Sequence, residues 1–243
     1  MKRLFPVLCA AMLLVSSMNV SAAFHNVCSV SKQLKDDRDV KDFNGVAAGG
    51  PIHVIITLGN TESCRFEGDA EAIETLITEV KGNVLIIRPK NSWTSWEHKY
   101  EGKKITAYVT AKSISSLTMS GSGSMALVGK VNSGTLSATL SGSGSIKAAA
   151  DVDHINGVIS GSGTLSLTGS ANDAKVVISG SGNFEGKSLS VNNLSTTVSG
   201  SGTVNIKADQ RIKAVISGSG NVNYSGNAEV EKTVIGSGRV RKI

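Results

Sequence analysis

Alternating apolar and polar positions predict strands in the first part of the chain. The apolar residues Ile52, Val54, Ile56 and Leu58 recur at every second position, the period that places one face of a strand in a core. The same interpretation applies to Val84-Leu85-Ile86-Ile87 and to the alternating residues Ile105, Ala107 and Val109. This part of the chain is therefore expected to contribute at least three strands.

A spacing of three and four residues separates a second group of apolar residues: Ile73, Leu76, Ile77 and Val80. Such spacing is typical of an amphipathic helix. Asp69 stands before its first turn, where a short acidic side chain can cap the helix, and Gly82 can end it. Residues 24–112 are accordingly predicted to form a small mixed α/β segment.

A repeat dominates the rest of the chain. The tetrapeptide Ser-Gly-Ser-Gly begins at Ser120, Ser141, Ser160, Ser179, Ser199 and Ser217, and a seventh, altered copy begins at Ile235. Successive copies are 21, 19, 19, 20, 18 and 18 residues apart. Such regular periodicity indicates a repeat architecture whose units are too short for propeller blades.

Apolar residues flank every copy of the tetrapeptide. The residue before each copy is Met119, Leu140, Ile159, Ile178, Val198, Ile216 or Val234, and the second residue after it is Met125, Ile146, Leu165, Phe184, Val204, Val222 or Val240. Each unit thus consists of a strand, a glycine corner and a strand, because glycine adopts backbone angles closed to other residues.

Equal units with equivalent inward-facing residues are expected to stack as parallel strands about 4.8 Å apart. Residues 113–243 are therefore predicted to form a parallel β-solenoid (β-helix) with coils of 18–21 residues, preceded by the α/β segment as a cap. Stacked antiparallel hairpins are the alternative, but they favour units that alternate in length or turn chemistry. Charged residues fill the last coil and are expected to protect its open edge: Glu229, Glu231, Lys232, Arg239, Arg241 and Lys242.

The chain begins with a pattern typical of a secretory signal peptide, residues 1–23. Lys2 and Arg3 precede an apolar run over 4–15, and small residues end the segment at Ala22-Ala23. Export places Cys28 and Cys64 in an oxidising compartment, where a disulfide between them is the first interpretation. Two buried free thiols are the alternative. No later segment approaches the ~20 apolar residues of a membrane span.

Composition narrows the function classes. The 243 residues include 27 Gly, only 4% aromatic and 18% charged residues, and the formal net charge is +6. These proportions argue against a helix bundle and against a polybasic arm that binds nucleic acid. The mature chain is expected to be soluble or peripherally attached.

The segment 91–100 holds both tryptophans in an otherwise aromatic-poor sequence. Its candidate ligand-binding residues are Trp93, Trp96, Glu97, His98 and Tyr100. Aromatic rings beside polar groups can bind a sugar or a peptide, because they offer a large contact area with a polar handle. The alternative is that the rings pack over the junction between the two regions.

No catalytic, metal or cofactor site is predicted. Glu97 and His98 lack a recognisable third group, and Gly121-Ser122-Gly123 belongs to the repeat rather than to a strand-to-helix turn. Calcium-binding solenoid repeats place an aspartate after their glycines. This chain has Ser, Thr, Asn or Arg there, at residues 124, 145, 164, 183, 203, 221 and 239.

The order of these features resembles one bacterial family. A secretion signal, the segments Asp42-Phe43-Asn44-Gly45-Val46 and Ile52-His53-Val54-Ile55-Ile56, and serial Ser-Gly-Ser-Gly coils are similar to the head GIN domain family, described as auto-transporter adhesin heads. The resemblance covers roughly residues 40–240. It implies a secreted or envelope-associated β-helical protein with a role in adhesion and no catalytic residues.

The sequence thus favours an exported, non-enzymatic, adhesin-like binding module, located in the periplasm or on the cell surface. Its partner is expected to be a glycan or a protein surface, without nucleic acid and without a membrane-spanning segment. One alternative is a periplasmic structural protein that maintains the envelope by binding partner proteins. Another is a carbohydrate-active enzyme, suggested only by the use of β-helices in polysaccharide lyases.

Overall fold

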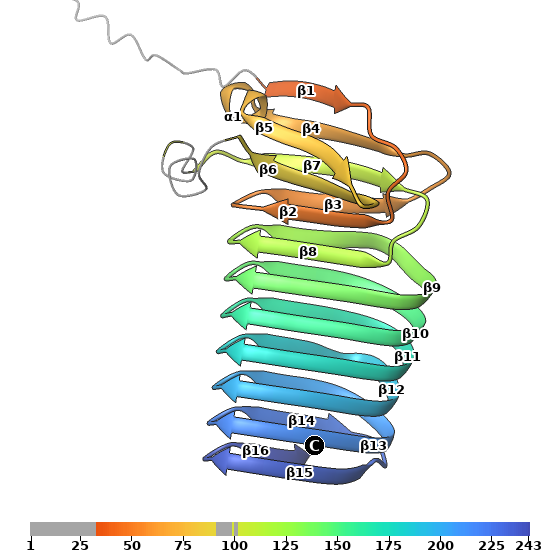
Figure 1. Ribbon diagram of the computed structural model, residues 1–243, viewed down its shortest axis with the longest axis vertical. Coiled ribbons are helices and arrows are strands. Elements are labelled where there is room, and N and C mark those ends of the chain that lie inside the picture. Colours follow the sequence, from red (N-terminus) through yellow and green to blue (C-terminus); the bar gives the residue numbers. More distant parts are fainter. Residues whose placement is uncertain (1–32, 91–98, 100–101) are drawn as a thin grey trace, which may run out of the picture. The chain divides into compact units, whose positions relative to one another are not determined.

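The computed structural model describes residues 33–90, 99 and 102–243. Residues 31–243 form one compact unit, and its described strands belong to a single sheet of 16 strands (Figure 1). The first half contributes β1 (Gln33–Arg38), β2 (Gly45–Gly49), β3 (His53–Leu58), β4 (Ser63–Asp69), α1 (Ala70–Glu74), β5 (Leu76–Lys81), β6 (Val84–Pro89) and β7 (Ile105–Ala111). The predicted strands at 52–58, 84–87 and 105–109 are confirmed.

The repeats form a parallel β-solenoid, as the sequence predicts. Their strands are β8 (Ser116–Gly121), β9 (Ser124–Gly142), β10 (Ser145–Gly161), β11 (Thr164–Gly180), β12 (Asn183–Gly200), β13 (Thr203–Gly218), β14 (Asn221–Ser225), β15 (Glu229–Gly236) and β16 (Arg239–Lys242). Every pair from β8 to β16 is parallel, which excludes the antiparallel alternative for the repeats.

The Ser-Gly-Ser-Gly corners lie directly above one another. Ser160 pairs with Ser141 on one side and Ser179 on the other, and Gly161 pairs with Gly142 and Gly180. Ser162 donates its backbone N–H to the carbonyl of Gly142 at 3.0 Å, so the hydrogen-bond ladder continues through the corner.

Glycine is required at the second corner position for two reasons. Gly161 has φ +120°, a backbone conformation that other residues rarely adopt, and a Cβ added there would lie 2.5 Å from the carbonyl oxygen of Gly142. The same close approach recurs from coil to coil, at Gly180 and Gly200 among others. Close stacking of backbones at the corner therefore explains the repeated glycine.

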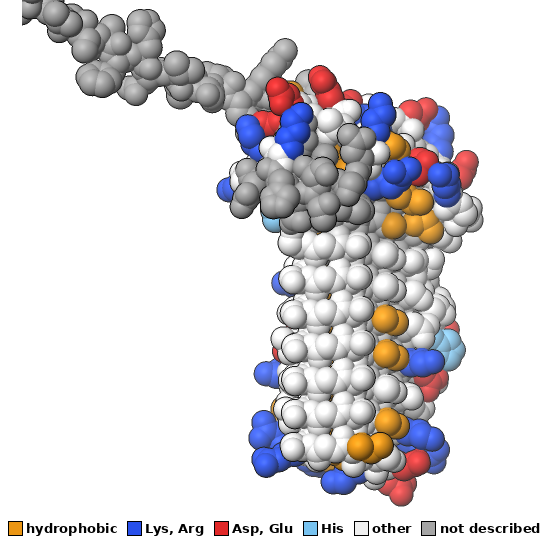
Figure 2. All heavy atoms as spheres, turned by 60° about the vertical axis from the view of Figure 1, so that its left-hand side comes forward, with side chains coloured by type: hydrophobic (Ala, Val, Ile, Leu, Met, Phe, Trp, Pro, Cys, Tyr) orange, Lys and Arg blue, Asp and Glu red, His pale blue; other side chains and the backbone are white. Residues whose placement is uncertain are grey.

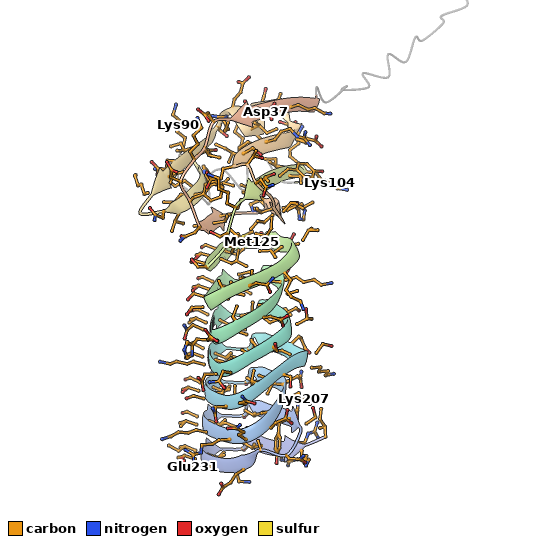
Figure 3. All side chains as sticks on the ribbon, turned by 90° about the vertical axis from the view of Figure 1, so that its right-hand side faces the viewer. Asp37, Lys90, Lys104, Met125, Lys207 and Glu231 are labelled. Carbon is orange, nitrogen blue, oxygen red and sulfur yellow. The ribbon has the colours of Figure 1, made fainter. Side chains whose placement is uncertain are left out.

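The core is a column of apolar side chains inside the coils. The residues before the tetrapeptides, from Met119 to Ile216, are fully buried, and those two positions after it, from Met125 to Val222, are at most 1% exposed. In the last coil Val234 and Val240 are only partly buried. Figure 3 shows Lys207 and Glu231 extending outward from the ribbon, in keeping with their exposure.

The first strands continue the solenoid rather than standing apart from it. β2 pairs in parallel with β6 and β8, and β3 pairs in parallel with β7 and β9. β4 and then β1 are added antiparallel at the edge beyond β7. Pairing between strands therefore crosses the predicted boundary near residue 112. That the chain is organised in two parts divided there stays a prediction.

The predicted helix begins at the expected place but is much shorter than expected. Asp69 Oδ1 accepts the backbone N–H of Ala72 at 3.2 Å, which confirms its capping role, but α1 ends at Glu74. Residues 76–81 form β5 instead, antiparallel to β6. Gly82 and Asn83, with φ of +54° and +62°, make the two-residue turn that joins these strands, so Gly82 ends a strand rather than a helix.

A ladder of polar side chains connects four successive coils near the C-terminal end. Asn205 Nδ2 donates to Glu185 Oε1 at 3.0 Å, and Asn223 Nδ2 donates to Asn205 Oδ1 at 2.9 Å. Arg241 Nε completes it by donating to Asn223 Oδ1 at 2.8 Å. Both asparagines are buried, and their amides align between an anion and a cation.

Candidate functional site

The aromatic residues that the sequence singles out lie outside the described part of the chain. Trp93, Trp96, Glu97, His98 and Tyr100 belong to the connection between β6 and β7. Their role in ligand binding therefore stays a prediction.

The predicted disulfide also stays a prediction, because Cys28 lies outside the described residues. Cys64, on β4, is 1% exposed and is a free thiol in this structure. Burial among apolar side chains raises the pKa of this thiol from 9.0 to about 12.

The described residues do form a groove of about 590 Å³ on the side of the solenoid, which we call the side groove. Its lining comes from β9, β10, β11, β12 and β13: Thr135, His154, Ile155, Asn156, Asp173, Ala174, Lys175, Asn193, Leu194, Ser195, Arg211 and Lys213. Five successive coils thus build one site that runs across the strands.

Strand register places these side chains in two outward-facing rows. Thr135, His154, Asp173, Asn193 and Arg211 form the first row, and Asn156, Lys175, Ser195 and Lys213 form the second. Between the rows lie the buried side chains of Ile155, Ala174 and Leu194, at 1 to 3% exposed. The period-two alternation that fills the core therefore also aligns the groove.

Asp173 is surrounded by hydrogen-bonding groups. His154 Nδ1 lies 3.3 Å from Asp173 Oδ2, Asn193 Nδ2 donates to Oδ1 at 3.0 Å, and Asn172 Nδ2 donates to Oδ2 at 3.0 Å. These contacts come from three neighbouring coils. They fix the position of the only carboxylate that lines the groove.

Positive charge exceeds negative charge in the side groove. Three cationic side chains line the groove, those of Lys175, Arg211 and Lys213, whereas Asp173 supplies the single lining carboxylate. Lys213 Nζ lies 3.9 Å from Glu231 Oε1, and both side chains are more than 60% exposed, so this pair is weak. The groove therefore offers cationic and neutral hydrogen-bonding groups to solvent.

The chemistry of the groove is suited to binding. His154 and Asp173 form a pair, but no hydrogen bond in the described part of the chain joins His154 to the hydroxyl of Thr135 or Ser195, so neither hydroxyl is activated as a nucleophile. Among the described residues, no group of three or more His, Cys, Asp or Glu side chains is placed to hold a metal ion. No described helix is long and apolar enough to cross a bilayer.

A different surface lies at the Ser-Gly-Ser-Gly corners, which we call the serine face. Its two exposed rows are Ser120, Ser141, Ser160, Ser179, Ser199 and Ser217, and Ser122, Ser143, Ser162, Ser181, Ser201, Ser219 and Ser237. Figure 2 shows this face as an uncharged array, with charged side chains to either side of it. The corner geometry of the solenoid accounts for this regular array, so the array by itself does not indicate a ligand.

A smaller hollow of about 320 Å³ surrounds Glu62, near the first coils. Glu62 Oε2 accepts the backbone N–H of Asp42 at 3.2 Å and Lys112 Nζ at 3.0 Å, and Oε1 accepts the backbone N–H of Phe43 at 3.4 Å. These hydrogen bonds, that of Lys112 foremost, lower the pKa of the Glu62 carboxyl. They attach the turn before β2 to the following strands, which is a structural role.

Sequence reasoning missed the side groove. No pattern in the sequence analysis connects His154 with Asp173, whereas the structure places His154 Nδ1 3.3 Å from Asp173 Oδ2. The signal was available, because Thr135, His154, Asp173, Asn193 and Arg211 each stand six residues before the next corner. Aligning the coils on the tetrapeptide would have placed these residues in one row.

Solved structures share this fold. A "putative adhesin" from Bacteroides fragilis matches with a TM-score of 0.76 and 22% identity, over 87% of this chain and 97% of its own. A "putative adhesin" from Parabacteroides distasonis gives 0.70 and 23%, over 88% and 98%. A "putative lipid binding protein" from the same species gives 0.67 and 21%, over 87% and 96%.

The family comparison covers most of the chain. None of the curated proteins matches it. The profile described as "Putative auto-transporter adhesin, head GIN domain" matches residues 42–228, which include β2 to β7 and all the coils that line the side groove. The protein therefore belongs to the head GIN domain family.

Proposed function

We propose that this protein is an exported, non-enzymatic, adhesin-like module that binds an extended ligand along its side groove. The observation that carries the proposal is the groove itself. Five successive coils align exposed lysine, arginine, asparagine and serine side chains in two rows, and these side chains donate and accept hydrogen bonds without forming a catalytic constellation.

Two further observations support a binding role. The family is described by adhesion, and structures of the same fold carry the descriptions adhesin and lipid binding protein rather than the name of an enzyme. Residues 1–23 have the pattern of a secretory signal peptide, which is consistent with a place in the periplasm or at the cell surface.

Protease shaving of intact cells tests where the protein resides. An epitope tag after Ile243 reports access at the C-terminal end, which is needed because the coils can resist cleavage. Loss of the tag while a periplasmic marker survives supports surface display and adhesion. Persistence of the tag until the envelope is opened contradicts the surface role and favours capture of envelope partners.

Attachment of purified protein tests the groove directly. We expect beads coated with the protein to attach to some member of a panel of glycan and matrix surfaces. The triple variant Lys175→Gln, Arg211→Gln and Lys213→Gln should lose most of this attachment. A matched triple variant at exposed lysines outside the groove should keep it: Lys147→Gln, Lys187→Gln and Lys207→Gln. Equal loss in both triples would show a general charge effect and contradict the assignment.

A further inference from the structure

The cations of the side groove lie in an ordered pattern. Lys175 and Lys213 belong to the same row, with Ser195 of the intervening coil between them. Two coils at the inter-strand spacing separate their backbones by roughly 10 Å, a length comparable to a disaccharide. Neither Lys175 nor Arg211 has an ion-pair partner among the described residues, so their charge is available to a ligand.

Arg211 and Lys213 stand two residues apart on β13, one in each row of the groove. Ile212 between them is fully buried, so both cationic side chains point outward from the same coil. Together they make a paired cationic position, whereas Lys175 makes a single-cation position two coils away. An arginine can bind a carboxylate with two parallel hydrogen bonds, so the paired position is the stronger one.

Neutral hydrogen-bonding groups share the two rows with the cations. Asn156 and Ser195 share the row of the lysines, and Thr135 lies at the far end of the other row. Hydroxyl groups of a sugar match these side chains, since both donate and accept hydrogen bonds.

The low charge density argues for a glycan rather than a nucleic acid. Three cations and one carboxylate are spread over five coils, while a nucleic acid carries one negative charge per nucleotide and is bound by many lysine and arginine contacts. Asp173 adds a negative charge beside Lys175, which would repel a phosphate at that coil. A polymer with an anionic group on alternate units matches the two-coil spacing of Lys175 and Lys213.

We propose that the side groove binds an acidic polysaccharide with a carboxylate on every second sugar. The glycan lies along the solenoid, with one carboxylate at Lys175 and the next between Arg211 and Lys213. The intervening neutral sugar lies beside Asn193 and Ser195 of the coil between them. Asp173 shares a coil with Lys175, so its carboxylate weakens the attraction of that position for an anion. This inference rests on the proposed function of the groove and adds the class of ligand to it.

Calorimetric titration with hyaluronan oligosaccharides tests the inference, because hyaluronan carries a carboxylate on alternate sugars. We expect binding that weakens as the salt concentration rises, and no binding of neutral cellulose oligosaccharides. Lys175→Gln and Lys213→Gln should each weaken binding about fivefold, and Arg211→Gln about tenfold. Lys147→Gln, an exposed lysine outside the groove, should bind like the wild type.

Asp173→Asn distinguishes an electrostatic effect of Asp173 on the bound glycan from a purely structural role. Asparagine keeps an acceptor oxygen for Asn193 and removes the negative charge, so hyaluronan should bind about threefold more tightly. Unchanged or weaker binding would contradict the position assigned to the glycan. An unchanged unfolding midpoint in urea shows that each variant is folded.

Parallel titrations with polygalacturonate, sulfated chondroitin and duplex DNA separate the outcomes. Binding of DNA in preference to every glycan overturns the inference. Failure of all acidic glycans to bind, while bead attachment still depends on the groove lysines, also overturns it but leaves the proposed function standing. Failure of every surface and every probe overturns both.

Discussion

At the scale of single residues, the corner glycines link the repeat sequence to the fold most directly. Gly161→Ala introduces a Cβ at φ +120° and 2.5 Å from the carbonyl oxygen of Gly142. Backbone strain and overpacking should together lower the free energy of unfolding by roughly 2 to 4 kcal/mol, measured by urea denaturation. Gly134→Ala is the control, because its Cβ would approach only Asp153, at 3.9 Å. If Gly161→Ala lowered the free energy of unfolding no more than Gly134→Ala does, the close-stacking explanation would be wrong.

Glu62 should make stability depend on pH. Its pKa in the folded protein is lowered from the ordinary 4.5 by hydrogen bonds from Lys112 and from the backbone of Asp42 and Phe43. A lowered pKa means that the carboxylate stabilises the fold above about pH 4.5, and that this contribution is lost as the pH falls through the folded pKa. Melting temperatures of wild type and Glu62→Gln should therefore differ at pH 7 and converge in acid. A constant difference would exclude this role for the charge.

Cys64 should be unreactive in the folded, reduced protein. Burial raises its pKa to about 12, so at pH 8 almost no thiolate is present, and the side chain is shielded from reagent. Iodoacetamide should modify Cys64 only after unfolding in urea, as mass spectrometry of the modified peptide would show. Rapid modification of the native protein would mean that β4 opens readily.

The same reagent tests the predicted disulfide. If Cys28 and Cys64 are joined in the exported protein, unfolding without reductant should expose no reactive thiol, and reduction should expose both. Two reactive thiols without reductant would instead establish the free-thiol alternative.

At the scale of elements, buried polar ladders hold neighbouring coils together and fix their register. Asn205→Ala removes the partner of both Glu185 and Asn223, so buried polar atoms lose hydrogen bonds. The free energy of unfolding should fall by about 1 to 3 kcal/mol. Asn227→Ala, at an exposed position, should change it little. An equal effect at both positions would show that the ladder does not stabilise the fold.

The sequence predicted the strands because burial imposes a period of two, and the core confirms it from Val54 to Val222. It failed over residues 76–81, where Leu76, Ile77 and Val80 fit a helical period as well as a strand. The structure resolves this ambiguity through pairing with β6 and the turn at Gly82-Asn83. Short apolar runs carry no information about such long-range pairing.

The side groove was harder to predict than the core for a physical reason. Core positions repeat the same kind of residue in every coil, whereas the first groove row changes from Thr135 to His154, Asp173, Asn193 and Arg211. Outward-facing side chains are not constrained by packing, so their chemistry varies while their spacing persists. Only the coil register brings these side chains together, so the site is found by aligning the coils on the corner repeat.

At the scale of the whole described molecule, the coils form a nearly one-dimensional array. The long coil strands β9 to β13 each pair mainly with the strand before and the strand after. Stability in such an array is approximately the sum of coil terms and nearest-neighbour terms. One coil should therefore be removable, provided that the chain rejoins at an equivalent position.

Deletion of residues 160–178 meets this condition, because Ser160 and Ser179 are paired in register and Ile159 would then precede Ser179 as it precedes Ser160 now. The shortened protein should fold cooperatively, with a denaturant m-value lower by roughly a tenth, since less surface is exposed on unfolding. Deletion of residues 160–169 is the control, because it removes a corner and about half a coil and leaves the following strand on the wrong side of the solenoid. Circular dichroism and urea unfolding distinguish the two. Equal disruption in both would mean that the coils depend on contacts beyond their nearest neighbours.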